Sequence, residues 1–415
     1  MNPFKKLYCR AFQTGMRIAL PFMPYKDPAP IGGLDGVPAV LRRHGISRVL
    51  LVTDRTVRGL SLTAPLEQAL AEAGVACTVY DGTVPNPTTD NVAEALALYR
   101  ANDCQGLIGF GGGSSIDCAK AAGALVARPD RTLGQMEGLL KVSRKIPLLI
   151  AIPTTAGTGS ENTLAAIITD GPTHRKYPIN DFPLMPPYVV LEPSLTATQP
   201  PLLTATTGMD AMTHAVEAFI GRSTNARTRS DSIEAVKLIL AYLHRAVADD
   251  SDMEARKKMQ RAAYLAGSAF TRSYVGYVHA VAHTLGGRYG TPHGLANSVL
   301  LPIVLEQYGA HAHRRLAMLS RAVGVSQAQS DREAAEAFIG RIRSMNDSFG
   351  IPRTLDCIAD GDIPQLAAIA DHEGNPLYPV PVLWGVEELA HIYHLAQEEQ
   401  EYDRAGNSEY SVSPA

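Results

Sequence analysis

The stretch Gly106-Leu107-Ile108-Gly109-Phe110-Gly111-Gly112-Gly113-Ser114-Ser115-Ile116-Asp117-Cys118-Ala119-Lys120 decides the fold class of this chain. Its first five residues predict a buried strand, and three glycines then lead into a helix. Glycine lets a backbone approach a ligand closely, and the first turn of a helix presents free N–H groups to phosphate. Tight turns also use glycine, and the run is not GxGxxG. The junction alone therefore leaves phosphate binding and a simple turn open.

Other strand and helix patterns alternate around this junction. Strands that alternate with helices predict βαβ units and a parallel sheet. We expect strands at residues 48–52, 77–80, 106–110, 147–152 and 188–191, and helices at 65–73 and 92–101, the second capped by Asp90.

A second loop rich in glycine, threonine and serine follows the strand at 147–152 and reads Pro153-Thr154-Thr155-Ala156-Gly157-Thr158-Gly159-Ser160-Glu161. Open α/β sheets bind ligands at the carboxyl edge, where both glycine loops would lie. Together the two loops favour a nucleotide site. Asp54 ends the first strand, where a carboxylate binds ribose hydroxyls and repels the extra phosphate of NADP. A helix cap or an Asx turn explains Asp54 equally well.

The pattern changes after Pro201, where helical spacing replaces strands. We therefore expect an N-terminal arm at 1–30, an α/β domain at 31–200 and an all-helical domain at 201–415. The expected helices are 204–220, 226–246, 253–272, 278–285, 310–323, 331–348 and 386–399, and the polar tail 403–415 is expected to be frayed.

Two segments of the helical region carry metal-binding side chains, GMDAMTHAVE at 208–217 and VHAVAHTLGGRYGTPH at 278–293. Helical residues four apart share a face, and Pro292 should end or bend the second helix. One carboxylate with several imidazoles suits iron(II) or zinc, whereas scattered surface histidines are the simpler alternative. The candidate ligands by spacing are Asp210, His214, His279, His283 and His293.

The bulk composition limits the class of protein. With 415 residues, 46% hydrophobic and 19% charged, the chain predicts two domains with a sizeable core. A net charge of −3 argues against nucleic acid and anionic membranes as partners. Five cysteines without a CxxC pair predict neither disulfides nor a zinc ribbon, which fits a reducing cytoplasm.

The first 28 residues are basic and amphipathic. Arg17 interrupts the apolar run that a signal peptide needs, and no stretch of the chain approaches the ~20 apolar residues of a membrane span. We expect an arm that docks on the body or on a partner subunit.

Taken together, the chain resembles the iron-containing (group III) alcohol dehydrogenases. The resemblance runs from about residue 31 to 397 and is carried by GGGSSIDCAK at 111–120, PTTAGTGSE at 153–161, GMDAMTHAVE at 208–217 and VHAVAHTLGGRYGTPHGLANSVLLP at 278–302. The chain departs from the family's usual pattern at Glu192, where aspartate is typical before Pro193, and in its longer first 30 residues.

The resemblance implies a Rossmann-like NAD-binding domain followed by an all-helical metal-binding domain. The implied metal ligands, for Fe(II) or zinc, are Asp210, His214, His279 and His293. His283 is then no ligand, although its spacing from His279 suits one, and is linked to proton handling. The implied cofactor contacts are Asp54, Asn86, Gly112, Gly113, Ser114, Thr154, Thr155, Thr158 and Lys176.

The implied activity is NAD(H)-dependent oxidation of a small alcohol or reduction of an aldehyde, with the metal as Lewis acid, in a homodimer or larger homo-oligomer. One alternative is a lyase like dehydroquinate synthase, which uses NAD transiently with zinc. Its polyanionic substrate would favour more Lys and Arg near the histidines. The other alternative is a metal-binding protein without catalysis.

Overall fold

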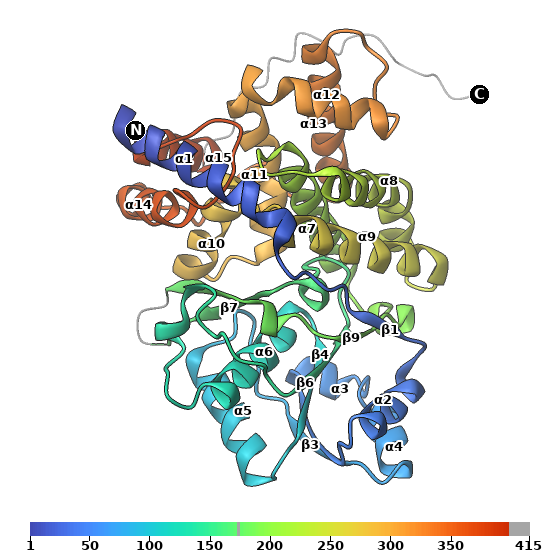
Figure 1. The fold of residues 1–415 in the computed structure, drawn as a ribbon. Helices are drawn as coiled ribbons and strands as arrows, with labels where there is room; N and C mark the ends of the chain where they lie inside the picture. The colour runs from blue at the N-terminus through green and yellow to red at the C-terminus, as the bar shows by residue number, and fades with distance from the viewer. Residues whose placement is uncertain (172–174, 398–415) are drawn as a thin grey trace, which may run out of the picture.

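The structure, a computed structural model, describes residues 1–171 and 175–397 (Figure 1). A sheet with helices on both faces forms the lower part of the molecule in Figure 1, and a group of helices lies above it. The predicted α/β part followed by a helical part is confirmed. The tail at 403–415, for which fraying is expected, lies outside the described residues.

The main sheet has six strands in the order β1-β9-β6-β4-β2-β3, and every neighbouring pair is parallel. Successive side chains along its strands pack on opposite faces of the sheet. Leu50 and Leu107 belong to the apolar cluster on one face, and Leu51 and Ile108 belong to the cluster on the other. The strands are β1 Ala29–Ile31, β2 Arg48–Val52, β3 Ala76–Tyr80, β4 Gly106–Gly111, β6 Leu148–Pro153 and β9 Tyr188–Val190.

Helices cover both faces of this sheet. They are α2 Val37–Arg43, α3 Arg55–Gly59, α4 Ala64–Glu72, α5 Thr89–Ala101 and α6 Gly113–Ala127. The predicted cap of α5 was wrong. Thr88 is the capping residue: its hydroxyl accepts from the Asn91 N–H, and the Asn91 side chain accepts from the Thr88 N–H. Asp90 lies inside the first turn, where a carboxylate favours the positive helix end but does not cap it.

A second, three-stranded sheet lies beside α6 and was not predicted. It contains β5 Gly138–Leu139, β7 Ala165–Thr169 and β8 Lys176–Asn180, and β7 pairs antiparallel with β8. Residues of β8 alternate between half-buried and buried, which is a strand signal, but Pro178 in its centre argues against a strand on sequence grounds. The sheet matters for function because β8 begins at Lys176.

From residue 201 to 397, the regular elements of the described chain are all helical. The α-helices are α7 Pro201–Ile220, α8 Ala226–Ala248, α9 Met253–Thr271, α10 Tyr277–Tyr289, α11 His293–Tyr308, α12 Ala310–Ala322, α13 Asp331–Ser348, α14 Ile363–Gly374 and α15 Val386–Gln397. Short 3-10 turns connect elements throughout: η1 Leu20–Phe22, η2 Leu34–Gly36, η3 Gly134–Met136, η4 Ser160–Asn162, η5 Phe182–Leu184, η6 Pro193–Thr196 and η7 Asp360–Asp362.

Two of these helices, α11 and α14, were not predicted. Pro302 lies inside α11, and a proline normally breaks a helix. Pro292 was expected to end or bend the helix that is α10, but another residue ends it. Gly290, in the left-handed conformation with φ of 68°, ends α10, and Pro292 instead precedes the first residue of α11.

The first helix, α1 Pro3–Ala19, runs across the outside of the helical part (Figure 1). Asn2 caps it by accepting from the Lys5 N–H. Within residues 1–171 and 175–397, no helix is long and apolar enough to span a bilayer.

Candidate active site

Four side chains that the sequence singled out converge where α7, α10 and the start of α11 meet. One ligand atom from each of Asp210, His214, His279 and His293 lies within 4.8 Å of the others. The first three residues are buried and His293 is half-buried. The structure therefore brings together the four residues that the family resemblance implied.

Close contact between α7 and α11 places His293 in this group. A Cβ on Gly294 would lie 2.6 Å from the Thr206 carbonyl oxygen, so only glycine allows the start of α11 to approach α7 this closely. As a result, Nε2 of His293 lies 3.6 Å from Oδ1 of Asp210, although 83 residues separate them in the chain.

Asn297 joins the four residues and was missed by sequence reasoning. Its Nδ2 donates a 2.7 Å hydrogen bond to Asp210 Oδ1 and lies 3.1 Å from His293 Nε2 and 3.3 Å from His279 Nε2. The available signal was its position one helical turn after His293. The amide fixes the orientation of the Asp210 carboxylate.

Glu217 orients His279 and was also missed. Its Oε2 lies 2.6 Å from His279 Nδ1, and its carboxylate accepts from the backbone N–H groups of Gly276 and Val278 at 2.8 Å each. A hydrogen-bonded Nδ1 leaves Nε2 of His279 facing Asp210, which is how carboxylates commonly orient metal-binding histidines. Glu217 lies seven residues after Asp210, two turns along the same helix face.

The electrostatics of the group suit a divalent metal. Burial and the neighbouring His279 hold the pKa of His214 well below its usual value. Burial also holds the pKa of His293 well below its usual value. Burial acts to lower the pKa of His279, but the hydrogen bond and charge of Glu217 outweigh it and raise that pKa. Neutral imidazoles are the form that binds metal, so the lowered pKa values of His214 and His293 favour binding at these two residues.

An orphaned polar atom tests whether a metal fits. His214 Nδ1 is buried without a hydrogen-bond partner in the described part of the chain, and it lies 3.9 Å from Asp210 Oδ1. Buried polar atoms are normally satisfied, and a cation among these donors would satisfy this one. One carboxylate with three imidazoles fits iron(II) or zinc.

His283 lies beside the group but belongs to a different pair. Its Nδ1 is 2.6 Å from Glu373 Oε1 on α14, and Tyr378 donates its hydroxyl to the same oxygen at 2.7 Å. The His283 ring stacks on His293, with centroids 5.3 Å apart. Burial acts to raise the pKa of Glu373, but the charge and hydrogen bond of His283 outweigh it and lower that pKa.

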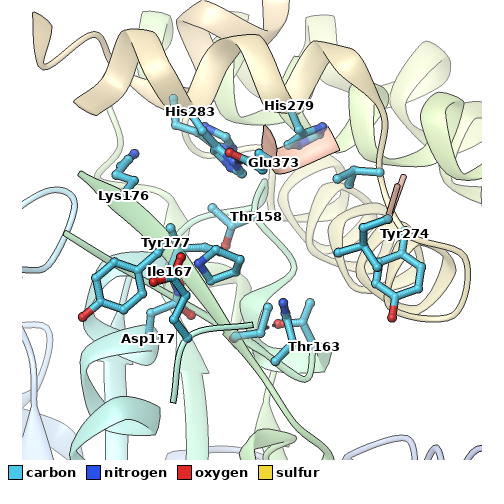
Figure 2. Close-up of a pocket in the computed structure, with 18 of the residues that line it drawn as sticks. Asp117, Thr158, Thr163, Ile167, Lys176, Tyr177, Tyr274, His279, His283 and Glu373 are labelled. Atoms are coloured by element: carbon cyan, nitrogen blue, oxygen red, sulfur yellow. Dashed lines mark hydrogen bonds and ion pairs between the residues drawn. The ribbon is translucent and has the colours of Figure 1, made fainter. Parts of the chain in front are cut away.

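A cavity of about 620 Å³ joins this group to the glycine loops of the α/β part. Figure 2 shows His279, His283 and Glu373 on one side of it, with Thr158 and Lys176 facing them from the other. Five of the nine expected cofactor residues line the cavity: Asn86, Gly113, Ser114, Thr158 and Lys176.

The other four expected cofactor residues do not line the cavity. Thr154 donates its N–H to the Gly111 carbonyl at 2.9 Å, which joins the two loops. A Cβ on Gly112 would lie 3.4 Å from the Thr155 side chain, so these two residues are neighbours. The fourth is Asp54.

Asp54 caps a helix, which was one of the roles that the sequence allowed for it. Its Oδ1 accepts a 2.9 Å hydrogen bond from the Val57 N–H at the start of α3. Its Oδ2 lies 3.4 Å from Ser115 Oγ in the first turn of α6, beside the triglycine run. Capping therefore occupies one oxygen and leaves the carboxylate at the edge where a ribose would bind.

Buried Lys120 holds the second loop in place and was not singled out. Its Nζ donates to the Ser160 carbonyl at 2.7 Å, to Thr163 Oγ1 at 2.9 Å and to the Ala165 carbonyl at 2.7 Å. Burial lowers its pKa to about 8. Because Ser160 and Thr163 lie before β7 and Ala165 is its first residue, Lys120 ties α6 to both the loop and the smaller sheet.

Comparison with known proteins agrees with this arrangement. The family model for iron-containing alcohol dehydrogenase matches residues 31–193, and the model for the C-terminal part of the Fe-containing alcohol dehydrogenase family matches residues 204–396. The chain belongs to the iron-containing alcohol dehydrogenase family. It is an oxidoreductase of the class that acts on CH–OH groups.

Individual relatives match across nearly their whole length. The 1,3-propanediol dehydrogenase of Klebsiella pneumoniae is 37% identical over 357 residues, which are 85% of this chain and 92% of the relative. The lactaldehyde reductase of Escherichia coli K12 is 34% identical over 373 residues, 88% of this chain and 96% of the relative. A solved alcohol dehydrogenase from Oenococcus oeni superposes with a TM-score of 0.85 at 34% identity and covers 90% of this chain and 100% of its own.

Proposed function

We propose that this chain is an NAD-dependent alcohol dehydrogenase and aldehyde reductase that uses Fe(II), with zinc as the alternative metal. The observation that carries the proposal is the single cavity, lined on one wall by the glycine-loop residues Gly113 and Ser114 and on the other by His279 and His293. A nucleotide held at the first wall would place its reactive ring against the second. The nicotinamide supplies the hydride acceptor or donor.

The residues of the α/β part would bind the cofactor. The start of α6 offers unpaired N–H groups after Gly112 to an anionic diphosphate, and Thr158 flanks the same loop. Asp54 would accept a ribose hydroxyl, and its charge would disfavour the extra phosphate of NADP. Lys176 extends into the cavity from β8.

Asp210, His214, His279 and His293 would hold the metal, which supplies a Lewis acid for the oxygen of an alcohol or aldehyde. Asn297 and Glu217 would keep the carboxylate and the His279 imidazole in the binding orientation. Burial of this group excludes water from all sides except the cavity.

The substrate would be small and uncharged. The cavity is lined by Val275 and Leu377, and by Phe270, whose ring stacks on His214 with centroids 4.3 Å apart. Apolar side chains of this kind suit a short carbon chain and disfavour a polyanion.

We assign the substrate proton to His283. Its Nδ1 is held by Glu373, so Nε2 is the atom that would receive the proton on oxidation and return it on reduction.

The proposal includes a cytoplasmic location, which is supported by the five free cysteines.

The test is purification without oxygen, metal analysis, and a panel of small alcohols and aldehydes followed through NADH absorbance. We expect about one divalent metal per chain and NADH formation with at least one alcohol. The His279→Ala variant should keep its circular dichroism but lose both metal and turnover, whereas His311→Ala, an exposed histidine on α12, should keep both. Bound metal without NADH formation from any alcohol would overturn the proposal in favour of a lyase or a non-catalytic protein.

A further inference from the structure

The helix α1 lies outside both segments that the family models match. These segments begin at residue 31, and α1 ends at residue 19. The candidate active site contains no residue of α1. The role of α1 therefore has to be inferred from its own surface.

One face of α1 is fixed on the helical part of the molecule. Gln13 donates from Nε2 to the Tyr378 carbonyl at 2.7 Å, and Arg10 donates from Nη1 to the Val380 carbonyl at 2.9 Å. Lys5 forms an ion pair with Asp371 on α14, and the Cys9 side chain is fully buried. These contacts leave the opposite face of α1 pointing away from the body.

That outward face is apolar. Large hydrophobic side chains on α1 and the adjoining turn η1 are 60–86% exposed: Phe4 86%, Leu7 71%, Tyr8 60%, Ile18 65% and Phe22 86%. In helical spacing they form one stripe about 27 Å long, at about 1.5 Å per residue. A monomer rarely exposes a contiguous apolar stripe of this kind, so it marks a contact surface.

Gly15 leaves the middle of the stripe without a side chain. A Cβ at this position would meet nothing within 4 Å in the described part of the chain, and no positive φ requires glycine. Glycine weakens a helix relative to alanine, so the packing and conformation of this chain alone do not account for it. With Ala11 one turn earlier, Gly15 makes a shallow site in which a second helix fits closely.

The stripe is complementary to itself when reversed. Phe4 and Phe22 lie nine residues before and after Gln13, Tyr8 and Ile18 lie five residues from it, and Ala11 and Gly15 lie two. Two antiparallel copies of α1, related by a two-fold axis at the level of Gln13, would thus pair large side chains at both ends and small ones in the centre.

We propose that the outward face of α1 is the contact surface for a second copy of this chain, joined by antiparallel packing of the two α1 helices about a two-fold axis. In this register Lys6 lies level with Leu20 and Arg17 with Cys9, so no cation of one helix lies level with a cation of the other. The five exposed side chains offer on the order of 600 Å² per chain, near the ~800 Å² per partner of a stable interface.

The test measures the mass of the full-length protein in solution by light scattering. A Gly15→Lys substitution places a charge at the centre of the face without disturbing the chain's own packing, and should halve the mass at micromolar concentration. Gly340→Lys is the matched control, because Gly340 is also helical, exposed and open to a Cβ on α13. Its mass should equal that of the wild type. An unchanged mass for Gly15→Lys, or a monomeric wild type, would overturn the proposal.

The antiparallel orientation has its own test. Chains carrying Phe4→Cys and chains carrying Phe22→Cys, mixed and oxidised, should form a disulfide between unlike chains, and neither variant alone should crosslink efficiently. Efficient crosslinking of Phe4→Cys with itself would indicate a parallel arrangement and contradict the two-fold model. Capture of a monomeric wild type by phosphatidylserine vesicles, lost in Gly15→Lys, would assign the face to a membrane instead.

Discussion

The Nδ1 atom of His283 lies 2.6 Å from Oε1 of Glu373, although the two residues come from different helices 90 positions apart. This contact pairs His283 with α14, and His283 is not among the four residues whose ligand atoms converge. It leaves His279, one turn earlier, facing Asp210. Two histidines with helical spacing thus have different partners and, we infer, different roles.

The His283→Ala variant should keep its metal and cofactor and lose turnover. We expect kcat to fall by roughly 10²–10⁴-fold, the usual contribution of a positioned acid–base group. Metal content, NAD binding and kcat are the measurements. Glu373→Gln keeps a hydrogen-bonding side chain but removes its charge. Its kcat should lie between those of His283→Ala and the wild type. Metal loss in His283→Ala, with metal retained in His293→Ala, would show that the two roles are reversed.

The Glu217→Gln variant should bind metal about 10–100-fold more weakly, the typical effect of removing a partner that orients a ligating histidine. The substitution weakens the hold on His279 Nδ1 and leaves the four candidate ligands in place. A competition titration with a chelator measures the affinity. Glu94→Gln, whose carboxylate instead accepts from the Tyr80 hydroxyl in the α/β part, is the control and should bind metal normally. Equal affinities would remove Glu217 from the site.

The Asp54→Asn variant should admit NADP while keeping the fold. Asparagine caps a helix as well as aspartate does, so α3 should keep its start, but the negative charge facing a 2′-phosphate is gone. We expect the kcat/KM ratio of NADP to NAD to rise by about tenfold, which corresponds to ~1.4 kcal/mol. Asp54→Gly should also admit NADP, and should weaken NAD binding by roughly 0.5–3 kcal/mol through the lost hydrogen bond. An unchanged preference in both variants would leave Asp54 with the capping role alone.

NAD binding should weaken as pH rises through about 8. Burial lowers the pKa of Lys176 to about 8. Below that pH the ammonium group is charged and attracts the anionic cofactor, and above it the charge is lost. The KM for NAD, measured from pH 6.5 to 9.5, should therefore increase across this range. Lys176→Arg keeps its charge throughout and should flatten the profile. A rise that is identical in both proteins would exclude Lys176 as its source.

The amino-acid sequence determined those features that depend on residues close together along the chain. Apolar runs of five or six residues predicted the parallel strands β2, β4 and β6, and the glycine-containing stretches after β4 and β6 predicted the loops at their carboxyl ends. Helical spacing predicted the pairing of Asp210 with His214 on α7. These signals are readable because strand and helix periodicities, and the backbone hydrogen bonds of a helix, are local.

Tertiary structure alone decided which distant side chains meet. The choice between His283 and His293 as neighbour of Asp210 depends on a left-handed turn at Gly290 and on close packing of Gly294 against α7, neither of which has a periodic signal. Glu373 reaches His283 only because α14 packs against α10, and the outward face of α1 follows from where its other face docks. Such contacts arise from packing between elements far apart in the chain, so the local pattern of one sequence does not contain them.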